Sequence, residues 1–147
     1  MKRFTVKAGS WLVLRKGGNV LMIKRKNTGW HDGDYALVSG HLEPGETLRE
    51  AMAREAKEEV GISISIKDLK PVHVMQKTDG IGKGGDYVVV FFEAHRWKGI
   101  PRNMEPDRCS DVVWFDLKKL PENTVPLARH ALKMIDDGKP YSEFGFA

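Results

Sequence analysis

Residues 40–62 read GHLEPGETLREAMAREAKEEVGI and carry most of the chemically informative side chains of the chain. Thr47 and Glu50 form a T-x-x-E pattern, which is typical of the capping box that starts a helix. Gly61 stands where the C-terminal end of a helix favours glycine. The stretch therefore predicts a helix from about Leu48 to Val60, preceded by a polar loop.

Acidic side chains share one stripe of this predicted helix. At about 100° per residue, Glu55, Glu58 and Glu59 fall within an arc of about 100°. Carboxylates so crowded repel one another, and a hard divalent cation such as Mg²⁺, which prefers oxygen ligands, would relieve that repulsion. Taken alone, however, such a triplet is more often a solvated face, with Glu50 and Arg54 as an i,i+4 ion pair.

The spacing across the whole stretch favours the metal site. Residues 40–62 follow the pattern G-x5-E-x7-R-E-U-x-E-E-x-G-U, in which U is an apolar residue. This pattern resembles the Nudix box of the Nudix hydrolases, with every fixed position occupied. Residues 24–29 and 103–109, together with Trp114 and Phe115, resemble the MutT-like branch of that family. The resemblance thus covers most of the chain.

The resemblance implies a fold of the α/β (α+β) class, a Nudix-type α/β/α sandwich with a mixed β-sheet and a loop–helix–loop catalytic motif. The chain reads as one domain over residues 1–147, without a linker or internal repeat. The apolar segments 3–14 and 19–25 are joined across Lys16–Asn19, which predicts a hairpin. Further strands are expected at 35–39, 63–66, 70–77, 87–95 and 112–115, and a last helix at about 125–136.

The resemblance also implies roles for the glutamates of the helix. Glu58 and Glu59 are expected to bind the metal. Glu55 is expected to be either a further ligand or the general base, and in either role it would help to convert water into a nucleophile. Mg²⁺ is the expected cofactor, and Mn²⁺ is an expected substitute.

Residues outside the helix stripe complete this expected site. Arg54 and Glu46 are expected to pair, which would fix the loop and steer Glu55. Many members of the family have Gly-Gly where this chain has Ser39–Gly40, but the Ser39 carbonyl is still expected to bind the metal. Glu105 lies on the loop before the strand at 112–115, where MutT-like members place an additional metal-binding carboxylate.

The expected reaction is in-line attack by water on one phosphorus of a nucleoside (deoxy)triphosphate, ordinary or modified, releasing nucleoside monophosphate and pyrophosphate. An ADP-ribose or nucleotide-sugar pyrophosphatase shares the box and differs only in the pocket. A catalytically silent nucleotide-binding module is a third reading, although such a protein has no need to keep Arg54, Glu55, Glu58 and Glu59 together.

Candidates for substrate contacts are less specific. Arg25 and Lys26 precede a loop that could close over phosphates, although solvated surface charges explain them equally well. MutT-like proteins can read a purine from a position similar to that of Asn123, but an N-cap of the last helix is the better explanation of this residue. Four aromatic side chains could stack a base, of which the last two are better explained as core: Trp30, His31, Tyr87 and Phe91.

Composition narrows the partners and the setting. The formal net charge of +4 favours anionic partners, yet no run of five or more basic residues is present, which disfavours nucleic acid as the main partner. The longest apolar run, Tyr87–Phe92, is too short to cross a bilayer. The single cysteine, Cys109, favours a reducing, cytoplasmic setting. Relatives of this kind are often dimeric, and a homodimer stays open.

Overall fold

The described part of the chain folds into a β-sheet and two α-helices. The computed structural model describes residues 2–146; Met1 and Ala147, the ends of the predicted 1–147 domain, lie outside the described residues. The helices are α1 (Leu48–Val60) and α2 (Pro126–Asp136), with a 3-10 helix η1 (Ile66–Asp68). The strands are β1 (Lys7–Lys16), β2 (Asn19–Arg25), β3 (Tyr35–Ala36), β4 (Val38–His41), β5 (Lys70–Lys77), β6 (Tyr87–Ala94), β7 (Cys109–Asp116) and β8 (Tyr141–Phe144).

β1 is the centre of the mixed sheet. It pairs antiparallel with β2 and β4 and parallel with β6, so that the strand order is β3-β2-β1-β6-β5-β8, with β4 added on β1 and β7 on β2. The expected hairpin between the first two strands is confirmed by the pairing of Lys16 with Asn19. β1 is buried from Gly9 to Leu14, which is typical of a strand covered on both faces.

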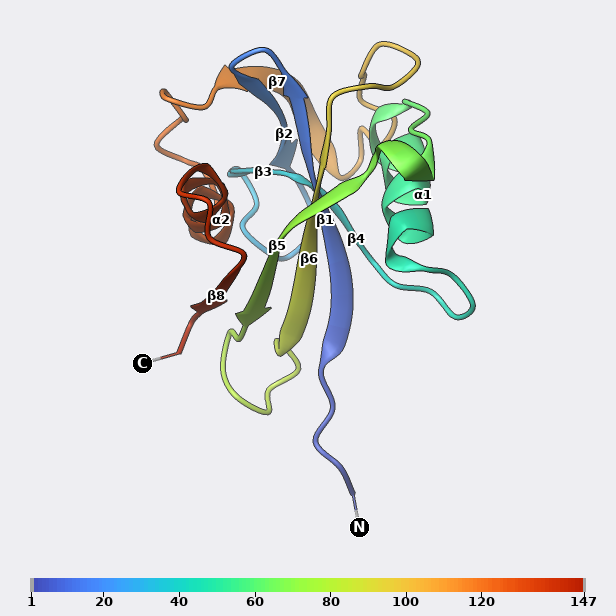
Figure 1. Cartoon of the computed structure of the whole chain (residues 1–147). Coiled ribbons are helices and arrows are strands. Elements are labelled where there is room, and N and C mark those ends of the chain that lie inside the picture. The colour runs from blue at the N-terminus through green and yellow to red at the C-terminus, as the bar shows by residue number, and fades with distance from the viewer. Residues whose placement is uncertain (1, 147) are drawn as a thin grey trace.

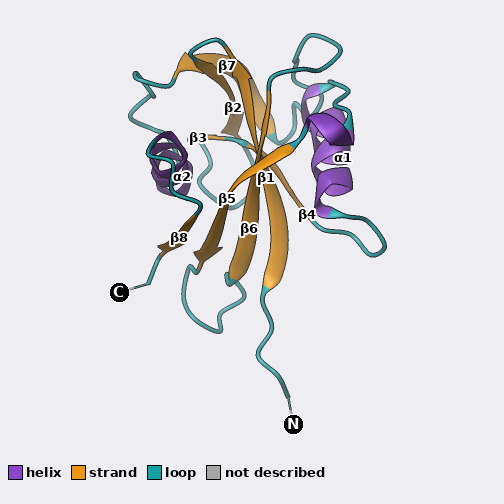
Figure 2. Cartoon of the chain, in the orientation of Figure 1, coloured by secondary structure: helices purple, strands orange, loops and turns teal. Residues whose placement is uncertain are grey.

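The two faces of the sheet are covered by different helices (Figures 1 and 2). Successive side chains of a strand point to opposite faces. Trp11 of β1 accordingly packs in one buried cluster with residues of α2, and Leu12 packs in a second cluster with Met52 and Ala56 of α1. This arrangement confirms the expected α/β/α layers. Within residues 2–146, neither helix has the length and apolar character that a membrane span requires.

The ends of α1 are fixed by the local signals that the sequence carries. The Thr47 hydroxyl accepts a hydrogen bond from the Glu50 amide at 3.1 Å, and the Glu50 carboxylate accepts one from the Thr47 amide at 2.9 Å. At the other end, Gly61 has a φ of 72°, a left-handed conformation in which glycine meets no Cβ penalty. The predicted bounds of this helix, Leu48–Val60, are confirmed.

Several predicted elements need correction. The predicted strand 63–66 is wrong: only an isolated bridge joins Ser63 to Lys98, and η1 begins at Ile66. Asn123 does not cap the last helix, because Val125 stands at the N-cap and the Asn123 side-chain amide donates to the Gly33 carbonyl at 2.9 Å. β8 is not among the predicted strands; it pairs parallel with β5, which lies far from it in the sequence.

Candidate active site

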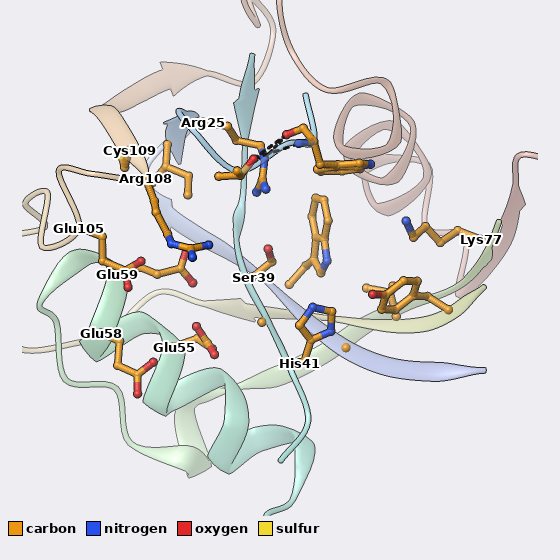
Figure 3. A pocket seen from close by; sticks show the side chains of 18 of the residues that line it. Arg25, Ser39, His41, Glu55, Glu58, Glu59, Lys77, Glu105, Arg108 and Cys109 are labelled. Carbon is orange, nitrogen blue, oxygen red and sulfur yellow. Dashed lines mark hydrogen bonds between the residues drawn. The ribbon is translucent and has the colours of Figure 1, made fainter. Parts of the chain in front are cut away.

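A cleft of about 630 Å³ opens beside the N-terminal half of β1. Figure 3 shows that its labelled side chains separate into two groups. Glu55, Glu58, Glu59 and Glu105 lie together on one side with Arg108, and Lys77 lies on the other side, beyond Ser39 and His41. We call the first side the carboxylate end. We call the second side the aromatic end, because Trp11, Trp30 and Tyr87 also line the cleft, and the Trp30 and Tyr87 rings pack against Lys77.

Arg54 organises the carboxylate end, although it does not itself line the cleft. Its guanidinium donates to both carboxylate oxygens of Glu46, at 2.8 and 3.1 Å, which confirms the expected pair. The same side chain donates to Glu55 at 2.7 Å and to Glu58 at 3.3 Å. The hydrogen bond from Arg54 is the main reason that the pKa of Glu46 is lowered, and that bond also raises the pKa of Arg54. Arg54 therefore steers two of the predicted metal ligands.

Gly40 is required by the close approach of β4 to α1. A Cβ atom at this position would lie 2.5 Å from Oε1 of Glu55, and closer still to its Cγ and Cδ atoms. Any side chain at position 40 would therefore displace the Glu55 carboxylate. Ser39, the neighbouring residue, lines the cleft, and metal binding by its carbonyl stays a prediction. The serine in place of the usual first glycine leaves the second, sterically necessary glycine in position.

Glu59 is partly buried, and one of its carboxylate oxygens is fully buried. Burial raises its pKa well above the ordinary value, the negative charges of Glu55 and Glu105 add to the shift, and the Ser39 amide opposes it. Its Oε2 atom is buried and has no hydrogen-bond partner among the described residues. Because an unpaired buried carboxylate oxygen is costly, this atom marks a place where a cation would be stabilising.

Glu105 joins these acids from the loop before β7. Its pKa is raised by burial, with the charges of Glu55 and Glu58 contributing, while the neighbouring Arg108 lowers it. The charge of Glu55 therefore raises the pKa of both Glu59 and Glu105, as expected of acids that lie close together. Glu105 thus lies where a further metal-binding carboxylate was predicted.

The donor set fits a hard divalent cation. Carboxylate oxygens are what Mg²⁺ and Mn²⁺ prefer, and Glu55, Glu58, Glu59 and Glu105 would hold such an ion. As the side chains lie, no three His, Cys, Asp or Glu residues within residues 2–146 converge on one metal position. Two of the four carboxylates, those of Glu55 and Glu58, are paired with Arg54.

Of the three predicted substrate-binding residues, one lines the cleft and two do not. Arg25 lines the cleft, where burial is the largest cause of its lowered pKa and its guanidinium lies 4.9 Å from the Trp30 ring centroid. Lys26 and Asn123 are exposed and are not among the residues that line the cleft. Lys26 instead donates to the Pro106 carbonyl at 3.4 Å. A role of either residue in substrate binding stays a prediction.

The side chains predicted as candidates for stacking a base also differ in their positions. Phe91 is fully buried in the core, as expected, and Trp30 lines the cleft. Tyr87 packs against the core, as its better explanation predicts, and it also lines the cleft, so a role in stacking a base stays a prediction. His31 is exposed, has a φ of 49° and is not a lining residue.

Residues that the sequence does not single out complete the cleft. Arg108 lies inside the stretch 103–109 that resembles the MutT-like branch, but charge alone does not separate it from other surface arginines. Lys77 ends β5 and is buried on the same face of the strand as His73 and Met75, a mixture of residues that does not mark a buried face in the sequence. Asp79 and Gly84 bring the glycine-rich loop after β5 to the rim.

Comparison with known proteins identifies the relatives of this chain. The family profile described as "NUDIX domain" matches residues 3–136. The chain is 33% identical over 110 residues to a protein of Methanocaldococcus jannaschii named ADP-ribose pyrophosphatase, covering 75% of this chain and 62% of that relative. It is also 38% identical over 60 residues to the nucleoside triphosphatase NudI of an Enterobacter species, covering 40% of this chain and 43% of the relative.

A solved structure agrees with the fold. The chain superposes on the crystal structure of a MutT NUDIX hydrolase from Burkholderia pseudomallei with a TM-score of 0.80 and 29% identity, covering 88% of this chain and 98% of the other. The names of the two sequence relatives specify different substrates. The comparisons therefore relate the chain to hydrolases named for different nucleotide compounds, and they do not specify its substrate.

Proposed function

The chain belongs to the Nudix hydrolase family, and from that premise we propose that it is a Mg²⁺-dependent pyrophosphohydrolase of nucleoside (deoxy)triphosphates, modified ones included. The products are nucleoside monophosphate and pyrophosphate. One observation carries the proposal: four glutamates from α1 and one loop line a single cleft, and one of them keeps a buried carboxylate oxygen without a partner. Nudix hydrolases generally use divalent metal ions, and this donor set suits Mg²⁺, with Mn²⁺ as a substitute.

Glu58, Glu59 and Glu105 supply oxygen ligands for the cation in this proposal, and Glu55 is a further ligand or the base. When bound, the cation supplies positive charge against the phosphate oxygens and makes water easier to deprotonate. Arg25 and Arg108, which also line the cleft, oppose the remaining negative charge of the phosphates.

The chain's own groups then carry the reaction. Arg54, itself held by both oxygens of Glu46, orients the Glu55 carboxylate toward the reacting water. Water attacks one phosphorus in line with the bridging oxygen that leaves, its proton passes to a carboxylate, and the phosphoanhydride bond breaks. The negative charge that develops stays within a cleft that the two arginines line.

A second candidate, hydrolysis of ADP-ribose or a nucleotide sugar, is favoured by the 33% identity to the protein named ADP-ribose pyrophosphatase. It uses the same carboxylate end and differs in what the other end binds. The chain spans 62% of the length of that relative, so the relative's substrate is a candidate only.

A product-resolved hydrolysis screen separates the candidates. The purified protein is incubated with Mg²⁺ or Mn²⁺ and with (d)NTPs, oxidised dNTPs, ADP-ribose, nucleotide sugars and dinucleoside polyphosphates. We expect monophosphate and pyrophosphate from triphosphates. Turnover confined to ADP-ribose or a sugar nucleotide would replace the proposed substrate by the second candidate. No turnover of any compound would leave a silent nucleotide-binding module.

A further inference from the structure

Two aromatic rings enclose a buried ammonium group at the aromatic end of the cleft. Nζ of Lys77 lies 5.2 Å from the ring centroid of Trp30 and 4.7 Å from that of Tyr87. Trp11 meets Trp30 edge to face, with the centroids 6.2 Å apart. These four residues all line the cleft, and they come from β1, β5, β6 and the loop after β2.

Lys77 is buried with spare hydrogen-bonding capacity. The residue is only 6% exposed, and an ammonium has three N–H donors. Among the described residues its one hydrogen-bond acceptor is Oδ2 of Asp79, at 3.3 Å, on a side chain that is itself 52% exposed. The remaining donors face ring surfaces and the cleft, so a ligand that offers acceptor atoms there would improve the solvation of this charge.

The two ends of the cleft suit the two ends of a nucleotide. Lys77 and the four glutamates lie on opposite sides of Ser39 and His41 (Figure 3). A cleft of about 630 Å³ lies in the range of sites for small organic ligands. With the phosphates at the carboxylate end, the base falls at the aromatic end, where ring faces stack on any base with little preference. Base selectivity must therefore come from the polar group in this part of the cleft.

We propose that Lys77 makes the aromatic end selective for a 6-oxopurine, such as guanine, over adenine; the proposal rests on the triphosphatase function proposed above. Guanine presents two neighbouring acceptors, O6 and N7, and an ammonium donates well to both. Adenine presents N7 beside the N6 amino group, which is a donor and opposes another donor. Asp79 holds the ammonium at the cleft, because it is the carboxylate that pairs with it.

The test compares bases in one protein and residues at one position. We expect kcat/KM for dGTP to exceed that for dATP by roughly tenfold or more, and ITP, which keeps O6 and N7 but lacks the 2-amino group, to resemble GTP. Lys77→Gln should lower turnover of dGTP and retain turnover of dATP, because an amide pairs with N6 and N7 of adenine. Lys77→Arg should keep the guanine preference. The matched control is Lys83→Gln, because Lys83 is exposed in a loop and does not line the cleft. This variant should not change the ratio of kcat/KM for dGTP to that for dATP.

Binding measurements keep this proposal separate from the proposed reaction. Calorimetric titration with GMP and with AMP reads the base preference whether or not any triphosphate is hydrolysed. Tighter binding of GMP, reduced or reversed in Lys77→Gln, supports the proposal even if the reaction proves to be different. Equal binding of GMP and AMP by the unaltered protein, or an equal loss for both bases in Lys77→Gln with Lys77→Arg no better, would overturn it. Productive use of ADP-ribose alone would overturn the proposed reaction, and the GMP and AMP titrations would still decide the base preference.

Discussion

The carboxylate end and the aromatic end of the cleft are built in different ways. Three of the four glutamates at the first end stand on one helix, and Arg54 of the same helix holds two of them. The second end is assembled from three strands and a loop, and its buried lysine has one exposed carboxylate as its partner. The first end thus concentrates negative charge for chemistry on phosphates, and the second offers ring faces and donors for recognition. Substitutions at the carboxylate end should leave base recognition unchanged, and substitutions at the aromatic end should leave metal binding unchanged.

The largest effect should come from the carboxylate end. Glu58→Gln keeps the size of the side chain but removes a charged oxygen ligand, and we expect kcat to fall by about 10²- to 10⁴-fold for every base alike. The Glu58 side chain is 52% exposed, so the melting temperature should stay nearly unchanged. Steady-state kinetics with dGTP and dATP measure the loss, and Glu122→Gln, at an exposed loop position, is the control. A loss for one base only would contradict the separation of the two ends.

Gly40→Ala should have a smaller effect on the same end. The new Cβ displaces the Glu55 carboxylate, and a misplacement of about 1 Å can cost a reaction roughly 10²-fold. The matched control is Gly18→Ala, because a Cβ at Gly18 meets no atom within 4 Å and the residue needs no left-handed φ. If Gly40→Ala is as active as Gly18→Ala, the close approach of β4 to Glu55 has no catalytic importance.

Metal-dependent stability distinguishes the ends by thermodynamics. Mg²⁺ at 100 times its Kd should stabilise the folded protein by about 2.7 kcal/mol, seen as a higher melting temperature than in EDTA. Glu59→Gln removes a buried charge with an unpaired oxygen, so it should melt at a higher temperature than the unaltered protein in EDTA and gain little from Mg²⁺. Lys77→Gln should keep the full gain. A Glu59→Gln variant that responds to Mg²⁺ as the unaltered protein does would remove this residue from the metal site.

The smallest effect concerns the helix that carries the carboxylate end. Thr47→Ala removes the N-cap hydrogen bond of α1 and should lower the free energy of unfolding by about 1 kcal/mol, measured by urea denaturation. The ratio of turnover of dGTP to that of dATP should not change. A changed ratio would show that α1 also reaches the aromatic end.

The carboxylate end is more predictable from the sequence than the aromatic end, because its helix is specified locally. The bounds of α1 follow from its local caps, and the Arg54–Glu46 pair follows from the resemblance to the Nudix box; the structure confirms both the helix and the pair. The aromatic end depends on which strands become neighbours. β1 meets β6 in parallel register, and Trp11 comes beside Phe91 only through that pairing. The hydrophobic periodicity of a single segment does not reveal which strands will pair.

The errors have the same physical origin. β8 is four residues long and depends on a parallel partner in β5, from which a long stretch of chain separates it. The predicted strand 63–66 has alternating apolar residues, but it finds only one bridge, at Ser63. Asn123 has the chemistry of a cap, yet Pro126 stands at the start of the helix and the Asn123 amide is engaged by Gly33. In each case a tertiary partner, or the lack of one among the described strands, outweighs the local pattern.

The most direct test of the central claim is ³¹P NMR of dGTP incubated with the protein, with Mg²⁺ and with EDTA. We expect dGMP and pyrophosphate as the first products with Mg²⁺, no hydrolysis with EDTA, and hydrolysis slowed by about 10²- to 10⁴-fold with Glu58→Gln. Formation of dGDP and phosphate, equal hydrolysis in EDTA, or full activity of Glu58→Gln would contradict it.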